Sequence, residues 1–122
     1  MNVKKDDLIR LKHMLEAARD ILAFTEGETR ESFKGDRKLN LAVVRLIEII
    51  GEAAARLTDD IKGQYTNVPW KVIIGMRNRL IHAYFDVDLD RVWDTVVVSI
   101  PELHTQIKKL LSEIEDSTTN TD

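Results

Sequence analysis

The segment DRKLNLAVVRLIEIIGEAAARL, from Asp36 to Leu57, carries the clearest structural signal in the chain. Apolar residues return along it every three or four positions, at Leu39, Val43, Leu46, Ile47, Ile50, Ala54 and Leu57. This is the period of a helix with one buried face. The opposite face carries Arg45, Glu48, Glu52 and Arg56, three and four residues apart, a spacing that favours ion pairs along a helix. The segment therefore predicts one long amphipathic helix.

Similar periodicity predicts helices before this segment. One should run from Asp7 to about Gly27, with Leu8, Leu11, Leu15, Ala18 and Leu22 on its buried face. A short helical turn between Glu28 and Lys34 should close at Gly35. Residues 58–67, TDDIKGQYTN, are polar and are expected to form a connection.

Two further helices are expected after this connection. Pro69 fits the first turn of a helix from Trp70 to about Tyr84, since its missing N–H is not needed there. The last helix should begin at Asp88, a good N-cap, and its apolar phase continues across Pro101, which predicts a kink there. Strand signals are absent, because the β-branched run at 96–98 lies inside helical periodicity. We therefore expect an all-α, antiparallel bundle of four to five helices.

Length and composition limit the class of protein. With 122 residues and 43% hydrophobic content, the chain predicts one domain over residues 1–115 and a disordered polar tail over 116–122. It has no cysteine, which excludes disulfides and thiolate metal sites. No membrane span or signal peptide is evident, so we expect a soluble, unexported, cytoplasmic protein.

Charge is distributed unevenly along the chain. The net charge of −3 argues against a general binder of polyanions. Between Asp60 and Asp86, however, the only charged residues are cations, namely Lys62, Lys71, Arg77 and Arg79. This window predicts a local positive field, although a fluctuation over so short a stretch would give the same pattern.

Arg77 is the residue that the predicted helices do not explain. On an ideal helix from Trp70 it falls at the centre of the apolar stripe, between Ile73 and Ile81. Burying an unpaired guanidinium costs several kcal/mol, so the stripe must either pair it or open onto something polar. An ion pair to Glu48 or Glu52 is one interpretation, and a functional surface is the other.

His82, Asn78 and Tyr84 extend the functional interpretation. A histidine can move protons near neutral pH and an arginine can hold a phosphate, and neither step requires a metal. These residues fit acid–base cleavage of RNA, whose 2′-hydroxyl supplies the nucleophile. On an ideal helix His82 projects about 140° away from Arg77, so a shared cleft would need two copies of the helix across a two-fold axis. The alternative is that His82 is a surface or packing residue and Tyr84 an interfacial core residue.

The sequence RNRLIHAY, from Arg77 to Tyr84, resembles the R-x4-H-x-Y signature of the HepT toxins, a branch of the HEPN superfamily. The resemblance extends to LAVVRLIEIIGEAAARL, VPWKVIIGMRNRLIHAYFDVDLDRVWDTV and IPELHTQI, and covers about three quarters of the chain. It implies a homodimeric HEPN bundle that acts as a metal-independent endoribonuclease, without a cofactor, in a type VII-like toxin–antitoxin system. The partner would be a minimal nucleotidyltransferase antitoxin of the HepT/MntA type, which attaches AMP to the motif tyrosine.

The resemblance also implies roles for individual residues. Arg77 and His82 become the catalytic pair, Asn78 the polar residue after the arginine, and Tyr84 the site of AMPylation, with Arg79 in support. A 2′,3′-cyclic phosphate should result, and AMP on Tyr84 should block RNA by bulk and charge.

Several alternatives remain open from sequence alone. Glu52 could orient Arg77 or could belong to a solvated row of charges. Gly51, in mid-helix, suggests a close approach of another helix. His13 and His104 are isolated on different helices, so no metal site is expected. A non-catalytic HEPN module that binds nucleotides or partners, and a purely structural helical dimer, are the competing functions.

Overall fold

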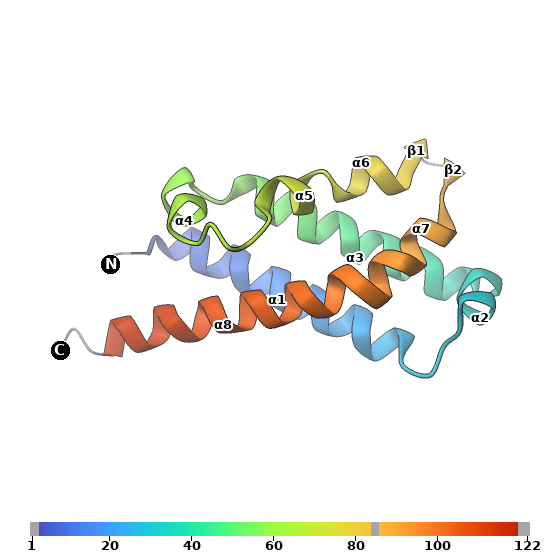
Figure 1. Cartoon of the computed structure of the whole chain (residues 1–122), viewed down its shortest axis with the longest axis horizontal. Coiled ribbons are helices and arrows are strands. Elements are labelled where there is room, and N and C mark those ends of the chain that lie inside the picture. Colours follow the sequence, from blue (N-terminus) through green and yellow to red (C-terminus); the bar gives the residue numbers. More distant parts are fainter. Residues whose placement is uncertain (1–2, 84–85, 120–122) are drawn as a thin grey trace.

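The computed structural model describes the backbone of residues 3–83 and 86–119, and the side chains of these residues except 82–83 and 117–119. Short helices and one small hairpin separate the longer helices (Figure 1). In chain order the elements are α1 (Lys5–Thr25), α2 (Arg30–Gly35), α3 (Arg37–Arg56), α4 (Asp59–Gln64), α5 (Trp70–Ile74), α6 (Met76–Leu80), β1 (Ile81–Ala83), β2 (Asp86–Val87), α7 (Leu89–Asp94), the π-helical segment η1 (Thr95–Ser99) and α8 (Ile100–Thr119).

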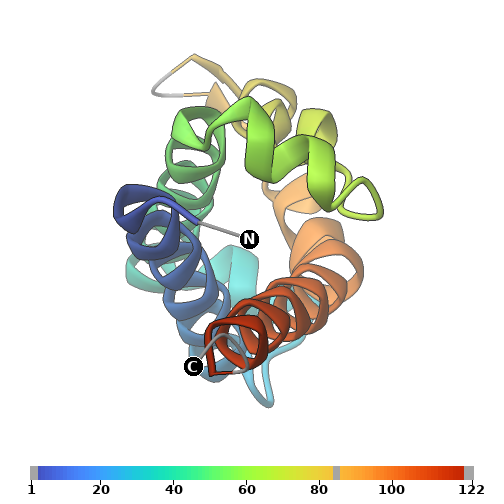
Figure 2. The ribbon, with the colours of Figure 1, turned by 90° about the vertical axis from the view of Figure 1, so that its left-hand side faces the viewer.

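The long elements form an antiparallel bundle. Helices α1 and α3 run in opposite directions, as do α5–α6 and the continuous rod of α7, η1 and α8 (Figure 1). Viewed along the bundle, these rods surround a common axis (Figure 2). The inward faces form one core, whose fully buried side chains include Leu11, Met14, Ile21, Phe33, Ile47, Ile50, Ile100 and Ile107. The predicted all-α bundle is confirmed.

Local capping explains where several helices begin. The Asp36 carboxylate accepts a hydrogen bond from the Leu39 N–H at 3.1 Å and starts α3. Asp88 caps α7 in the same way through the Arg91 N–H. Thr29 and Ser32 form a reciprocal capping box on α2. These side chains satisfy N–H groups that have no partner within the helix, so the expected starts near Asp36 and Asp88 are confirmed.

The segment expected to be only a polar connection contains helix α4. Thr58 caps this helix through the Ile61 N–H, and Thr58 is itself held by Asp7 of α1. The buried Asp7 carboxylate accepts from the Thr58 N–H at 3.0 Å and from the Thr58 hydroxyl at 2.6 Å. The contact between Asp7 and the part-buried Thr58 joins the start of α1 to the chain that follows α3.

The expected helix from Trp70 to Tyr84 is wrong for residues 81–83, and Tyr84 lies outside the described residues. It is divided at Gly75, and α6 ends at Leu80, where the carbonyl accepts the Asp88 N–H at 2.9 Å. The next residues form β1, which pairs antiparallel with β2 through Ile81 and Val87. The helical angles assigned to residues after Leu80 therefore do not hold.

The last helix also differs from expectation in detail. The chain stays helical through Pro101, and the kink expected there stays a prediction. The preceding segment η1 is π-helical, and the Ile100 N–H donates to the carbonyl of Thr95, five residues back. Proline cannot donate and its ring crowds the preceding turn, which a wider turn accommodates. A disordered tail is expected from residue 116, and the backbone of 116–119 continues α8. Residues 120–122 lie outside the described part of the chain.

Ion pairs anchor α2 to α7. The Arg30 guanidinium contacts the carboxylates of Asp90, at 3.2 Å, and Asp94, at 2.6 Å, and Lys34 also reaches Asp90. These cations lower the pKa of Asp90, mainly through the hydrogen bonds from Lys34 and Arg30. Beneath them the Phe33 ring packs on Trp93 with centroids 5.3 Å apart. The contacts fix α7, and with it the strand β2 that pairs with β1.

Within residues 3–83 and 86–119, no helix has both the length and the apolar character needed to cross a membrane.

Candidate functional site

A groove of about 490 Å³ lies between α3, α6, the hairpin and the start of α7. The outer side of α3 forms one wall, and Arg77 with the apolar side chains that follow α6 forms the other. Its lining residues are Arg37, Asn40, Leu41, Val44, Arg45, Glu48, Arg77, Ile81, Val87 and Leu89. The groove therefore contains the first residue of the R-x4-H-x-Y sequence.

Arg77 does not occupy the centre of a buried stripe. The buried face of α5 and α6 consists of Trp70, Ile73, Met76 and Leu80, and Arg77 lies on its solvent side with 47% of its side chain exposed. The buried face predicted from sequence for this helix was wrong, because it included Ile74 and Ile81. Both side chains are only half-buried. Arg77 is thus available to a ligand in the groove.

Glu48 of α3 holds Arg77 in place. The Arg77 Nε donates to the Glu48 Oε2 at 3.0 Å, and the Glu48 side chain is 22% exposed. The pair expected with Glu48 or Glu52 is therefore made with Glu48. Among the described residues Arg77 is engaged only through Nε, so the two terminal nitrogens of its guanidinium keep N–H groups that can bind an anion.

The groove carries an excess of positive charge. Its lining includes Arg37, Arg45 and Arg77 against the carboxylate of Glu48, and Arg45 also pairs with Glu52 beside the groove. From sequence, Arg45 was named only as a member of the charged face of the helix from Asp36, and Arg37 was not named. The signal that could have found them is their spacing from Glu48, which places Arg45 one turn before it on the same face. A phosphate would be attracted to this groove.

Arg79 and Asn78, predicted as supporting residues, do not line the groove. The Arg79 guanidinium turns back and donates to the carbonyl of Val72. A Cβ on Gly75 would lie 3.0 Å from the Arg79 Nη1, so the glycine leaves room for this side chain. Arg79 therefore stabilises the junction between α5 and α6. Asn78 is exposed.

His82 and Tyr84 are placed only in part. The backbone of His82 belongs to β1, directly after Ile81 of the groove wall, and its side chain is outside the described part of the molecule. Tyr84 lies outside the described residues. Their proposed roles rest on the sequence pattern.

Glu52 does not orient Arg77. Its carboxylate pairs with Arg45 at 3.5 Å, both side chains are more than half exposed, and it lines a different pocket. Its position on the solvated charged face of α3 is the alternative that the sequence left open. The orienting carboxylate belongs to Glu48, one turn earlier.

The arrangement can bind a phosphodiester. An exposed arginine, held by a carboxylate in a positive groove, can neutralise charge on phosphate oxygens. The histidine five residues later in the sequence is the candidate proton carrier.

Comparisons with known proteins point to the same chemistry. The family described as "Ribonuclease HepT-like" matches residues 14–110. A candidate RNase of Methanocaldococcus jannaschii is 38% identical over 117 residues, which cover 96% of this chain and 97% of the relative. The "Probable ribonuclease HepT" of Thermococcus cleftensis is 41% identical over 100 residues, 82% of this chain and 91% of the relative. A candidate RNase of Caldanaerobacter subterraneus is 40% identical over 103 residues, 84% of this chain and 92% of the relative. No solved structure gives a significant match.

Proposed function

The chain belongs to the HepT-like family of ribonucleases, and from that premise we propose that it is a metal-independent endoribonuclease that uses Arg77 and His82. The observation that carries this proposal is the placement of Arg77, which is exposed in a positively charged groove and fixed by Glu48. The enzyme acts in the cytoplasm as the toxin of a toxin–antitoxin pair.

Cleavage proceeds by attack within the RNA strand. His82 removes the proton of a ribose 2′-hydroxyl, and the 2′-oxygen attacks the adjacent phosphorus. The bond from phosphorus to the 5′-oxygen breaks, and that oxygen gains a proton to become a 5′-hydroxyl. Arg77 stabilises the charge that accumulates on the phosphate oxygens. The other product end is a 2′,3′-cyclic phosphate.

Glu48 acts through Arg77 as a positioning residue. Because it binds Nε, it limits the orientations that the Arg77 guanidinium can adopt. A fixed donor loses less conformational entropy on binding than a free arginine, whose side chain is rich in rotamers.

Two copies of the chain form the working enzyme in this proposal. The Arg77 groove is open, and a second copy across a two-fold axis would close it and bring two R-x4-H-x-Y segments to one basic cleft. A protein that sediments as a monomer at micromolar concentration and still cleaves RNA would contradict the dimer.

The antitoxin is a minimal nucleotidyltransferase that attaches AMP to Tyr84. The added phosphate would place negative charge in the same short segment as Arg77, and its nucleoside would occupy space that RNA needs. Intact mass of protein co-expressed with the antitoxin, compared with Tyr84→Phe, tests this step. An equal mass increase in both would place the modification elsewhere.

The experiment that tests the nuclease is incubation with RNA in EDTA. Wild-type protein, shown by intact mass to be unmodified, should cleave, whereas His82→Ala should not. His104→Ala on α8 is the matched control, because it removes a histidine outside the groove. Binding of RNA with no cleavage by any of the three would instead support a non-catalytic binding module.

A further inference from the structure

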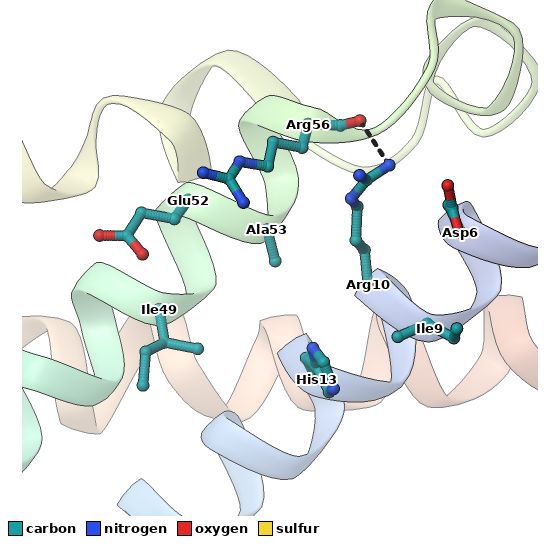
Figure 3. A pocket seen from close by; sticks show the side chains of 8 residues that line it. All are labelled: Asp6, Ile9, Arg10, His13, Ile49, Glu52, Ala53 and Arg56. Atoms are coloured by element: carbon teal, nitrogen blue, oxygen red, sulfur yellow. Dashed lines mark hydrogen bonds between the residues drawn. The ribbon is translucent and has the colours of Figure 1, made fainter.

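A second pocket lies between the start of α1 and the end of α3 (Figure 3). It has a volume of about 320 Å³. Four charged side chains and a histidine line it together with apolar residues: Asp6, Ile9, Arg10, His13, Ile49, Glu52, Ala53 and Arg56. No residue of the R-x4-H-x-Y sequence belongs to it, and the proposed cleavage chemistry does not use it.

The pocket offers donors that the fold does not consume. Arg10 donates one N–H to the carbonyl of Arg56 at 3.1 Å, which holds its guanidinium at the end of α3 (Figure 3). The Arg56 guanidinium makes no hydrogen bond or ion pair with any residue in the described part of the chain. His13 lies beside Arg10, three residues along α1. Of the two carboxylates, Glu52 is paired with Arg45 outside the pocket, so Asp6 is the carboxylate left to oppose Arg10 and Arg56.

Helix α3 connects this pocket to the Arg77 groove. Arg45, Glu48, Glu52 and Arg56 lie within about 80° of one another around the helix, so they form one continuous face. From Glu48, which holds Arg77, to Arg56 the rise is about 12 Å. At about 3.4 Å of rise per phosphate in a stacked strand, this distance spans roughly three to four phosphates.

We propose that Arg10, His13 and Arg56 form a remote subsite that binds the phosphodiester backbone of the RNA strand whose scissile phosphate is at Arg77. This inference rests on the proposed function and adds a second contact between the enzyme and its RNA substrate. The subsite fixes the register of the strand along α3, and it does not read bases. The donors come from both walls of the pocket, Arg10 and His13 from α1 and Arg56 from α3, so an extended strand can pass between them.

Binding of an uncleavable strand tests the subsite apart from catalysis. The probe is a labelled single-stranded oligodeoxynucleotide, which keeps the phosphates but lacks the 2′-hydroxyl nucleophile. Arg56→Gln should weaken binding roughly three- to tenfold and reduce the slope of log affinity against log salt by about 0.7, the value for one lost phosphate contact. Glu52→Gln should strengthen binding, because it removes a negative charge from the same face.

Arg19→Gln is the matched control. Arg19 is an exposed arginine of α1 that does not line the pocket. Its loss should leave affinity and salt slope close to the wild-type values. In cleavage assays, Arg56→Gln should raise KM with kcat unchanged, because a remote contact holds substrate and transition state alike.

The outcomes separate this inference from the proposed function. Cleavage of RNA by a protein in which Arg56→Gln and Arg19→Gln behave alike would overturn the subsite and leave the nuclease standing. Weaker binding by Arg56→Gln in a protein that cleaves nothing would support the subsite and contradict the nuclease. Tight binding of AMP alone that depends on Arg56, without any effect on the oligonucleotide, would assign the pocket to a mononucleotide and overturn the proposal.

Discussion

Replacement of Arg77 by glutamine should abolish activity with little loss of stability. Arg77 is 47% exposed and its partner Glu48 is 22% exposed, so the pair is close to a surface ion pair. Such pairs contribute about 0.2–1 kcal/mol. For a chain of this size, that loss lowers the melting temperature by roughly 5 °C or less. Loss of a donor that stabilises transition-state charge costs about 10²- to 10³-fold in kcat.

Urea unfolding followed by circular dichroism, beside cleavage of a labelled RNA, measures both effects on one preparation. Glu48→Gln is the control, since it breaks the pair but keeps the positive charge of Arg77. It should cost a similar amount of stability and much less activity. A loss of about 3 kcal/mol or more in Arg77→Gln, with activity that falls only in proportion to the unfolded fraction, would make Arg77 a structural residue and refute the reasoning.

Three further predictions concern stability. Gly51→Ala should raise the free energy of unfolding by up to about 1 kcal/mol, because alanine has the higher helix propensity and its Cβ would lie at an ordinary 3.6 Å from two carbonyls of α5. A lower urea midpoint would show that the helices need the glycine. Asp7→Ala should lower the free energy of unfolding by about 1–3 kcal/mol in the same assay, since the part-buried Thr58 N–H loses its acceptor; a change below about 0.5 kcal/mol would contradict this. Burial, with Lys108 and Arg19 nearby, lowers the pKa of His104 in the folded chain. The unfolded chain therefore binds a proton at His104 more readily, so the free energy of unfolding should fall as pH is lowered through about 6.5. His104→Gln should flatten that part of the urea-midpoint profile, and an unchanged profile would assign it to another group.

The sequence predicted the elements whose signal is local. Asp36 and Asp88 start their helices with their own side chains, and the apolar period from Leu39 to Leu57 selects the buried face of α3 without reference to the rest of the fold. The antiparallel bundle follows from such faces and from short connections.

Tertiary contacts determined what the sequence could not predict. The helix of Arg77 ends at Leu80 because Asp88, eight residues later, donates to its carbonyl and Val87 pairs with Ile81. Helix α4 depends on Thr58, which is held by the buried Asp7, 51 residues earlier in the chain. The apolar periodicity of neighbouring residues cannot reveal either of these tertiary contacts.

The sequence identified residues of the candidate site but did not predict how they are arranged. Arg77 was recognised from the motif, but its placement on a buried stripe assumed an unbroken helix. Glu48 and Glu52 are equivalent on the helical face, and only the position of α6 beside α3 selects Glu48 as the partner. The pocket at Arg56 joins residues more than 40 positions apart, so no local pattern indicates it.

The most direct test of the nuclease is mass spectrometry of the RNA ends left by unmodified protein in EDTA. The mechanism predicts fragments that end in a 2′,3′-cyclic phosphate and begin with a 5′-hydroxyl, formed by wild type and not by His82→Ala. It also predicts that a 2′-deoxy nucleotide at the cleaved position blocks the reaction. Fragments with a 5′-phosphate, or cleavage that persists at the 2′-deoxy position, would contradict attack by the 2′-hydroxyl and the role assigned to His82.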